Sequence, residues 1–323
     1  MFRREFLARF TAGATAARGW LCGAPTVAAQ KAAAPTHPAH KHAAPASPPS
    51  KLDRISISTW SLHNYFQTTR EKEFDLPGPM LALLDFPEMI VDRYKVHHFE
   101  FCSPHFASLE LAYLQELRSA LIRTHSHLVN IPVDIEELEI EGGLSDPSKI
   151  VRDKVVAASK PWIDIAAKLG AKSVRCDPGK MDPEDLAPTA QSYRALAAYG
   201  MAKGIQVIVE NHGGVGSEHP EDLVRLAKLV GANFGALPDF GNFPDEETRE
   251  KGLPVLFPLA HVVCHAKGLD IGADGEEKQY DFPKAIQASK KAAFKGIYSI
   301  EYEGAGDPYL GVQKTLDELL KYL

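Results

Sequence analysis

Cysteine is scarce in this chain of 323 residues. Only four are present, and Cys22 lies among the first thirty residues. The other three, Cys102, Cys176 and Cys264, show neither the close spacing of a metal or redox motif nor the even number of a disulfide framework. Each lies in an apolar stretch, so we expect small, buried core residues. Cysteine usage therefore argues against a disulfide-stapled fold and a thiolate metal site.

Long apolar runs and an excess of positive charge are also missing. No stretch reaches the roughly 18 apolar residues of a membrane-spanning helix, so we expect no membrane span. The chain has 36 Lys and Arg against 42 Asp and Glu, a formal net charge of −6. Because it also has no basic cluster, it shows no electrostatic footprint for a nucleic acid partner. The 45% of hydrophobic residues is enough for a full core.

Large apolar side chains are almost absent from residues 30–50, which consist mainly of Ala, Pro, His and Lys. Such a segment cannot bury a core, so we predict a disordered, Pro/Ala/His-rich linker. We interpret its histidines, His37, His40 and His42, as solvated side chains. The folded domain is then predicted to span residues 51–323.

The first 29 residues differ in character from the rest of the chain. The sequence RREFL at residues 3–7 resembles a twin-arginine export motif, and VAA at residues 27–29 is a small-residue cleavage candidate. We therefore predict a twin-arginine signal peptide over residues 1–29, with export to the periplasm and the export machinery as a partner. An irregular N-terminal helix is the alternative, since Arg18 interrupts the apolar region.

Eight short runs rich in apolar and β-branched residues recur along the predicted domain. They are Ile55–Trp60, His98–Cys102, His125–Ile131, Ser173–Asp177, Ile205–Glu210, Phe234–Asp239, His261–His265 and Ile297–Glu301. Runs of this length and composition predict β-strands.

The stretches between these strands predict helices. Apolar residues recur at helical spacing in Ala157–Leu169, Ala190–Lys203, Pro220–Val230 and Tyr309–Leu323, and the first three of these stop at a glycine. Eight strands alternating with helices over about 270 residues predict a single (β/α)8 TIM barrel. A doubly wound sheet would need a glycine-rich phosphate turn after an early strand, where this chain has TWSL at residues 59–62.

Four polar residues end the last four predicted strands: Glu210, Asp239, His265 and Glu301. Their separations of 29, 26 and 36 residues each correspond to one β/α unit. Barrel strands end at one mouth and lie about 4.8 Å apart, so four neighbouring ends can surround one ion. Three carboxylates and one imidazole favour Mn²⁺, with Mg²⁺, Co²⁺ or Zn²⁺ as alternatives. Any one of these residues alone would more often be a solvated or capping side chain; the set of four carries the prediction.

The segments around these residues resemble the xylose isomerase-like superfamily of sugar isomerases and epimerases. They are VENHG at residues 209–213, LPDFGN at 237–242, CHAKG at 264–268 and SIEYE at 299–303. The resemblance implies that Glu210 and Glu301 are both metal ligands and the catalytic acid/base pair, as in ketose 3-epimerases, with Asp239 and His265 chiefly ligands. Those enzymes have a histidine three residues after the aspartate, where this chain has Asn242.

Other polar or aromatic residues near the predicted mouth are weaker, substrate-binding candidates. They are His212, Lys267, Arg175, Glu100, His127 and Trp60. Three of them have a structural alternative: Lys267 as a surface lysine, Arg175 in an ion pair within the barrel, and Trp60 as a core residue.

Together these features predict a metal-dependent isomerase or epimerase that acts on a small carbohydrate through an enediolate. Export favours a free sugar or keto-sugar over a sugar phosphate, and the mouth has no glycine-rich phosphate loop. The same residues would serve a lyase or hydrolase of 3-keto-glycosides acting by β-elimination. A non-catalytic exported sugar-binding protein is a third hypothesis; it predicts the loss of a ligand or of a catalytic glutamate, and none is missing. Relatives are often oligomeric, so a homo-oligomer is also an expectation.

Overall fold

The computed structural model of the chain describes residues 50–71, 78–139 and 142–323. The domain predicted for residues 51–323 is thus described apart from two short gaps, at residues 72–77 and 140–141. The predicted signal peptide, residues 1–29, lies outside the described residues, as does the predicted linker apart from Ser50.

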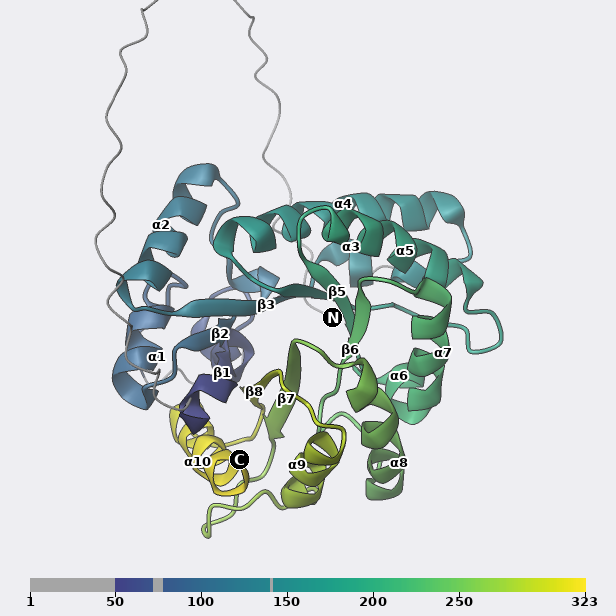
Figure 1. Ribbon diagram of the computed structural model, residues 1–323. Helices are drawn as coiled ribbons and strands as arrows, with labels where there is room; N and C mark the ends of the chain where they lie inside the picture. The colour runs from purple at the N-terminus through teal and green to yellow at the C-terminus, as the bar shows by residue number, and fades with distance from the viewer. Residues whose placement is uncertain (1–49, 72–77, 140–141) are drawn as a thin grey trace, which may run out of the picture. The chain divides into compact units, whose positions relative to one another are not determined.

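Eight parallel strands form one sheet, and each falls on one of the predicted strands to within a few residues. They are β1 Ile55–Ser58, β2 His98–Glu100, β3 His127–Val133, β4 Ser173–Cys176, β5 Gln206–Glu210, β6 Phe234–Leu237, β7 Val263–Gly268 and β8 Ile297–Tyr302. The sheet curls round a central space with helices on its outside (Figure 1). The predicted TIM-barrel architecture is confirmed.

The strand order is β6-β5-β4-β3-β2-β1-β8-β7, so β6 and β7 are the two ends of the sheet. The other neighbouring strands pair at three or more positions. Between β6 and β7 the described pairing is a single isolated bridge that joins Asp239 to His265. Two predicted metal ligands therefore lie at the seam where the barrel closes.

One longer helix follows each strand and covers the barrel. These helices are α1 Phe86–Tyr94, α2 Leu111–Arg123, α4 Lys149–Leu169, α5 Ala187–Met201, α7 Pro220–Val230, α8 Glu246–Leu256, α9 Phe282–Lys291 and α10 Pro308–Tyr322. Sequence signals set their ends: α7 begins at Pro220 and stops before Gly231, whose φ of 88° disfavours other residues. Short helices lie in the connections: α3 Glu136–Glu139, α6 Gly214–Glu218 and the 3₁₀ turns η1 Lys51–Arg54, η2 Thr59–Tyr65, η3 Ser103–His105, η4 Gly143–Ser145 and η5 Phe257–Leu259.

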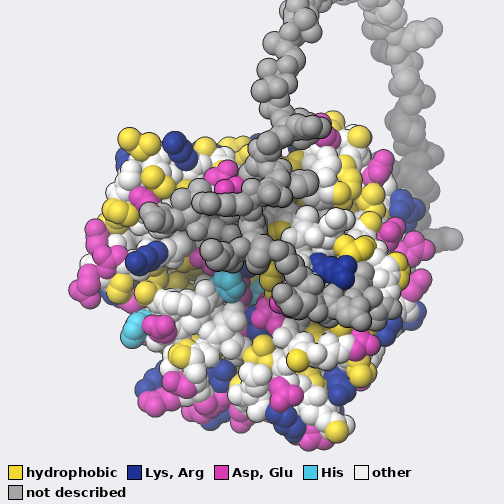
Figure 2. Space-filling view, turned by 180° about the vertical axis from the view of Figure 1, so that it is seen from behind, with side chains coloured by type: hydrophobic (Ala, Val, Ile, Leu, Met, Phe, Trp, Pro, Cys, Tyr) yellow, Lys and Arg dark blue, Asp and Glu magenta, His cyan; other side chains and the backbone are white. Residues whose placement is uncertain are grey.

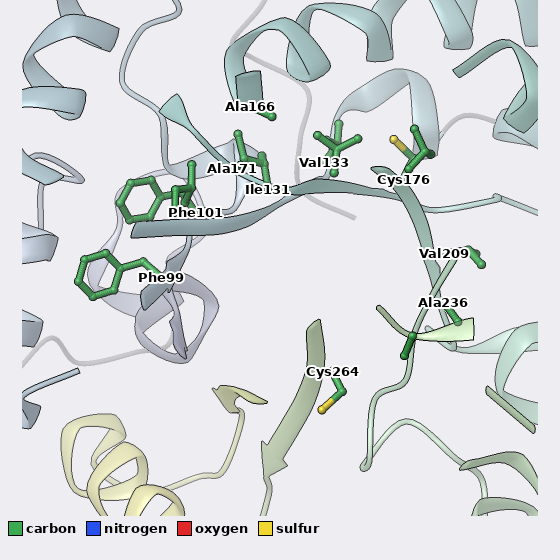
Figure 3. Packing of buried hydrophobic residues seen from close by; sticks show 14 of the residues in the cluster. Phe99, Phe101, Ile131, Val133, Ala166, Ala171, Cys176, Val209, Ala236 and Cys264 are labelled. Atoms are coloured by element: carbon green, nitrogen blue, oxygen red, sulfur yellow. The ribbon is translucent and has the colours of Figure 1, made fainter. Parts of the chain in front are cut away.

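Alternating side chains divide each strand between two environments. In β7, Cys264 and Ala266 belong to the main core between sheet and helices, whereas Val263 belongs to a small apolar cluster separate from that core. Figure 3 shows Ile131 and Val133 of β3 packed in the outer core. This alternation turns every second residue of each strand toward the inside of the barrel, where the polar side chains meet. The three predicted core cysteines are indeed buried and have free thiols.

The surface of the described part carries both signs of charge. Figure 2 shows acidic and basic side chains interspersed over one face of the molecule. Among the described helices, none is both long and apolar enough to cross a membrane.

Candidate metal centre

The four predicted ligands meet at one place inside the barrel. Each of Glu210, Asp239, His265 and Glu301 offers one donor atom, and these atoms all lie within 4.8 Å of one another. All four residues are buried. Glu210 is the last residue of β5, His265 and Glu301 point inward from β7 and β8, and Asp239 follows β6 by two residues.

One imidazole nitrogen is the meeting point of the cluster. His265 Nδ1 lies 3.0 Å from Glu210 Oε1, 3.3 Å from Asp239 Oδ2 and 3.3 Å from Glu301 Oε2. Carboxylates from three strands therefore face the same nitrogen, and a cation bound near that nitrogen would be within reach of all four side chains.

The turn after β6 fixes the orientation of Asp239. Its Oδ1 accepts hydrogen bonds from the backbone N–H groups of Gly241 and Asn242, at 2.7 and 2.9 Å. The Asn211 side chain bonds both backbone groups of Asp239, at 2.8 and 3.0 Å. A glycine is required at 241, because a Cβ there would lie 2.8 Å from the Cδ of Lys267. These contacts leave Asp239 Oδ2 directed at His265.

The other imidazole nitrogen of His265 is held by Glu100. Nε2 lies 3.0 Å from Glu100 Oε2, and Glu100 Oε1 accepts a hydrogen bond from Asn130 at 2.8 Å. Asn130 Oδ1 in turn accepts from Ser173, also at 2.8 Å. Glu100 is fully buried, with described contacts to His265 and Asn130, and its expected part in substrate binding stays a prediction. A carboxylate in this position fixes the histidine ring and leaves Nδ1 as the ligating atom.

The electrostatics of the cluster favour a positive charge at its centre. Burial opposes protonation of His265, yet the charges of Glu301, Glu100 and Glu210 raise its pKa well above the usual value. At Glu210 and Glu301 burial alone would raise the pKa, but the charge of His265 outweighs it and lowers both pKa values.

Asp239 carries a second sign that a cation fits. Its Oδ2 is buried and makes no hydrogen bond among the described residues. It lies 3.3 Å from His265 Nδ1 and 3.2 Å from Lys267 Nζ, so positively charged groups already surround the oxygen that a metal ion would take. The donor set of three carboxylates and one imidazole is also one that divalent ions accept.

Lys267 lies beside the cluster and is not a surface residue, since it is only 1% exposed. Its Nζ lies 3.0 Å from Glu301, 3.2 Å from Asp239 and 3.3 Å from Glu303. Burial opposes its charge, but these carboxylates raise the pKa of Lys267 well above the usual value. The structure thus brings Lys267 to the metal ligands as a buried cation.

Arg175 forms the predicted type of ion pair within the barrel, with partners that the sequence did not identify. Its Nε lies 3.0 Å from Glu210 Oε2, and its Nη1 lies 2.6 Å from Asp134 Oδ1. Asn242 Nδ2 donates to the other oxygen of Glu210, Oε1, at 3.2 Å. Both oxygens of Glu210 are therefore oriented by neighbouring strands or turns.

His212 lies at the rim, two residues beyond Glu210. Its Nδ1 is 3.0 Å from Asp177 Oδ2, and its side chain is 49% exposed. The hydrogen bond with Asp177, followed by the charge of Glu210, raises the pKa of His212 to about 9. The rim above Glu210 therefore presents a positively charged imidazole to solvent at neutral pH.

The last two candidates lie at opposite ends of the barrel. Trp60 follows β1 in η2, where its ring stacks on His63 with centroids 5.0 Å apart. Its backbone N–H donates to the hydroxyl of Ser58. Ser58 donates to Glu301 at 3.4 Å, so Trp60 is close to the cluster. His127 is the first residue of β3, at the amino end and away from the mouth. The prediction that His127 lines the mouth is wrong because β3 starts there and runs on to Val133.

The fold and this cluster define a TIM barrel with a candidate metal centre, and comparison with known proteins gives its family. The sequence model of the xylose isomerase-like TIM barrel family matches residues 91–322, so the chain belongs to that family. No curated protein matches the chain.

Solved structures with the same fold share little sequence with this chain. D-allulose 3-epimerase from Methylomonas sp. is 12% identical with a TM-score of 0.63, covering 84% of this chain and 98% of its own. The 3-keto-D-glucoside 4-epimerase from E. coli is 15% identical with a TM-score of 0.60, covering 83% and 99%. A xylose isomerase-like TIM barrel protein from Mycobacterium smegmatis, in complex with magnesium, is 16% identical with a TM-score of 0.58, covering 83% and 96%.

Proposed function

We propose that this protein is a divalent-metal-dependent isomerase or epimerase of a free sugar or keto-sugar. The observation that carries the proposal is that Glu210 and Glu301 approach the same atom, His265 Nδ1, at 3.0 and 3.3 Å. Two carboxylates from β5 and β8 thus border a single ion site from different sides. The similarity to sugar epimerases with this fold supports the choice of substrate class.

Glu210, Asp239, His265 and Glu301 would hold the ion, with Mn²⁺ preferred and Mg²⁺, Co²⁺ or Zn²⁺ as alternatives. When bound, the cation would polarise a substrate carbonyl and stabilise the negative charge that develops on it. Glu100 would act indirectly by holding the His265 ring.

Proton transfer falls to the two glutamates. One carboxylate removes the proton from the carbon next to the carbonyl, and the electron pair of that C–H bond moves into the carbonyl to give an enediolate. The other carboxylate returns a proton to carbon, and delivery to the opposite face inverts the centre. Arg175 and Asn242 orient Glu210, whereas Ser58 and Lys267 orient Glu301.

Two cations at the mouth would meet the substrate. Lys267 lies within 3.3 Å of three carboxylates and would stabilise an oxyanion or donate to a hydroxyl beside Glu301. His212 is fixed through Nδ1 by Asp177, which leaves Nε2 to donate to a sugar hydroxyl at the rim. Trp60, whose ring stacks on His63 and His105, would contact a sugar ring from the turn after β1.

Export through the signal predicted for residues 1–29 belongs to the proposal, and it favours free sugars because phosphorylated intermediates are rare outside the cytoplasm. A second reaction is also to be tested, since one protein of this fold acts on a 3-keto-glucoside. With a keto group at C3, removal of the C2 proton forms a C1–C2 double bond as the C1 substituent leaves with its bonding electrons. The same two glutamates would serve this lyase reaction.

The experiment is metal analysis of the purified protein, followed by proton NMR in D₂O with ketoses and 3-keto-glucosides. We expect deuterium to enter the substrate at the epimerised carbon; release of the aglycone would assign the lyase reaction instead. Glu210→Gln and Glu301→Gln should abolish exchange, with Glu221→Gln, an exposed acid on α7, as the matched control. Binding of sugar without exchange in the native protein would refute catalysis and leave a sugar-binding protein.

A further inference from the structure

The barrel has a hollow at its amino end, opposite the candidate metal centre. Its volume is about 350 Å³, and it is lined by His98, His127, His261, Lys172 and apolar residues that include Val129 and Ile297. His98, His127 and Ile297 are the first residues of β2, β3 and β8, which places the hollow at the end of the barrel where the strands begin. None of the residues assigned to the metal centre lines it.

Two of these histidines are held side by side by the sheet. His98 and His127 are register partners on the neighbouring parallel strands β2 and β3. Their ring centroids are 5.5 Å apart, and the ring planes are tilted by 31°. Two imidazoles bound to one tetrahedral ion, with metal–nitrogen bonds of about 2.1 Å, have centroids about 5 Å apart. The pair therefore stands at close to the spacing that a shared ion requires.

Polar atoms without partners surround His98. Its Nδ1 is buried and makes no hydrogen bond among the described residues, and the same holds for the hydroxyls of Ser56 and Ser299. Both serines are fully buried. Ser56 is the register partner of His98 on one side and of Ser299 on the other. A continuous row of unpartnered polar groups thus crosses three strands, which is unusual unless water or an ion supplies the missing contacts.

The charges around the pair permit a cation. Burial, followed by the charge of His127, lowers the pKa of His98, which keeps a ring nitrogen available as a ligand at neutral pH. The negative charge of Asp53 would attract a cation bound here, whereas His97, when protonated, and Lys172 would repel it. Lys172 is exposed, so its repulsion is screened by solvent.

We propose that His98 and His127 form a second metal site for a cation that prefers imidazole, namely Zn²⁺, Ni²⁺ or Cu²⁺, with His261 as the third donor. The three rings do not yet converge: within the described residues, the Glu210 cluster is the one group whose three or more donors lie within 4.8 Å. His261 is exposed and lines the same hollow, and the proposal requires its side chain to rotate toward the pair. Because this donor set is nitrogen and that of the metal centre is mostly oxygen, the two sites should bind the same ion with different affinities.

The test is calorimetric titration of the metal-free full-length protein with Ni²⁺, with bound metal counted after dialysis. Every protein carries His37→Ala, His40→Ala and His42→Ala, because imidazoles in residues 30–50 would bind Ni²⁺ on their own. We expect two equivalents of Ni²⁺ per chain. The Glu210→Gln change should weaken one of them, and His127→Ala the other, each by about tenfold or more in dissociation constant.

His127 is exposed, so its replacement should leave folding intact, and His219→Ala is the matched control because His219 is also exposed and lies at the start of α7. His98→Gln should have the same effect as His127→Ala. If both variants bind Ni²⁺ with the stoichiometry and affinity of the control, the site does not exist and the polar row holds water only. If His261→Ala alone is without effect, the assignment of the third donor is wrong.

Discussion

Removal of the metal should loosen the barrel at one place, the seam between β6 and β7. These strands end the sheet, and Asp239 and His265 form the described bridge between them. Two backbone hydrogen bonds hold it, from His265 N to Pro238 O at 2.9 Å and from Phe240 N to His265 O at 3.1 Å. Both bridge residues are proposed ligands. A bound cation would therefore link β6 and β7 through their side chains, at the pair of strands that shares the fewest backbone hydrogen bonds.

The size of the effect can be worked out from binding linkage. A cation present at 100 times its dissociation constant stabilises the folded state by about 2.7 kcal/mol. For a domain of this size, 1 kcal/mol corresponds to a shift in melting temperature of about 2–4 °C, so chelation should lower it by about 5–11 °C. The loss of protection should concentrate at the seam, because the other strand pairs keep three or more paired positions.

Hydrogen exchange measured by mass spectrometry, with and without chelator, is the assay. Peptides covering residues 234–243 and 261–268 should exchange faster after chelation, and those covering β3 and β4 should change little. Asp239→Asn should remove the metal-dependent shift in melting temperature, whereas Glu303→Gln, close to the cluster but outside the ligand set, should keep it. Uniform deprotection of all eight strands, or none at the seam, would refute this account of barrel closure.

Two further predictions concern buried glutamates. Glu100→Gln should weaken metal binding about 10–100-fold by calorimetry, because the His265 ring loses the carboxylate that fixes it, with Glu110→Gln as an exposed control. Burial and the charge of Glu277 raise the pKa of Glu318 to about 7, although the Glu277 N–H opposes the shift. The folded state then holds a proton that the unfolded state releases near pH 4.5, so stability falls as pH rises from there through about 7. Glu318→Gln should therefore raise the free energy of unfolding by about 1–2 kcal/mol at pH 8, allowing for solvent screening, and leave it unchanged at pH 4. The control Asp317→Asn should leave it unchanged at both pH values, with chemical denaturation as the measurement.

The ligand set was predictable because its residues obey a simple geometric rule. Parallel barrel strands end at one mouth, so inward-facing side chains near the ends of β5 to β8 had to converge. Strand alternation also put Lys267 on the same face as His265, two residues on. The sequence left open whether Lys267 was a surface residue, because strand β7 continues to Gly268 and the predicted strand stopped at His265.

The roles of Glu100 and His127 depended on details that a strand pattern does not contain. Glu100 stands at a register shift, where it pairs with Asn130 after Phe99 pairs with Leu128, and this irregularity brings Asn130 to its carboxylate. His127 was assigned to the mouth from a predicted strand that ended at Ile131. That predicted strand began at His125, so His127 already lay near its start, and the observed strand, which begins at His127, leaves the side chain at the amino end of the barrel.

The charge balance inside the barrel links the fold to the proposed chemistry. Four carboxylates lie buried together, and three cations lie beside them. The carboxylates are Glu100, Glu210, Asp239 and Glu301, and the cations are His265, Lys267 and Arg175. Without a metal, a proton on His265 offsets part of this negative charge, because the surrounding carboxylates raise the pKa of His265. A metal can take Nδ1 only by displacing that proton, so metal binding and proton release are coupled at the atom that both glutamates face. Each glutamate also has its own neighbouring cation, Arg175 for Glu210 and Lys267 for Glu301. This asymmetry gives the two halves of the proposed acid/base pair different environments from which to give and take a proton.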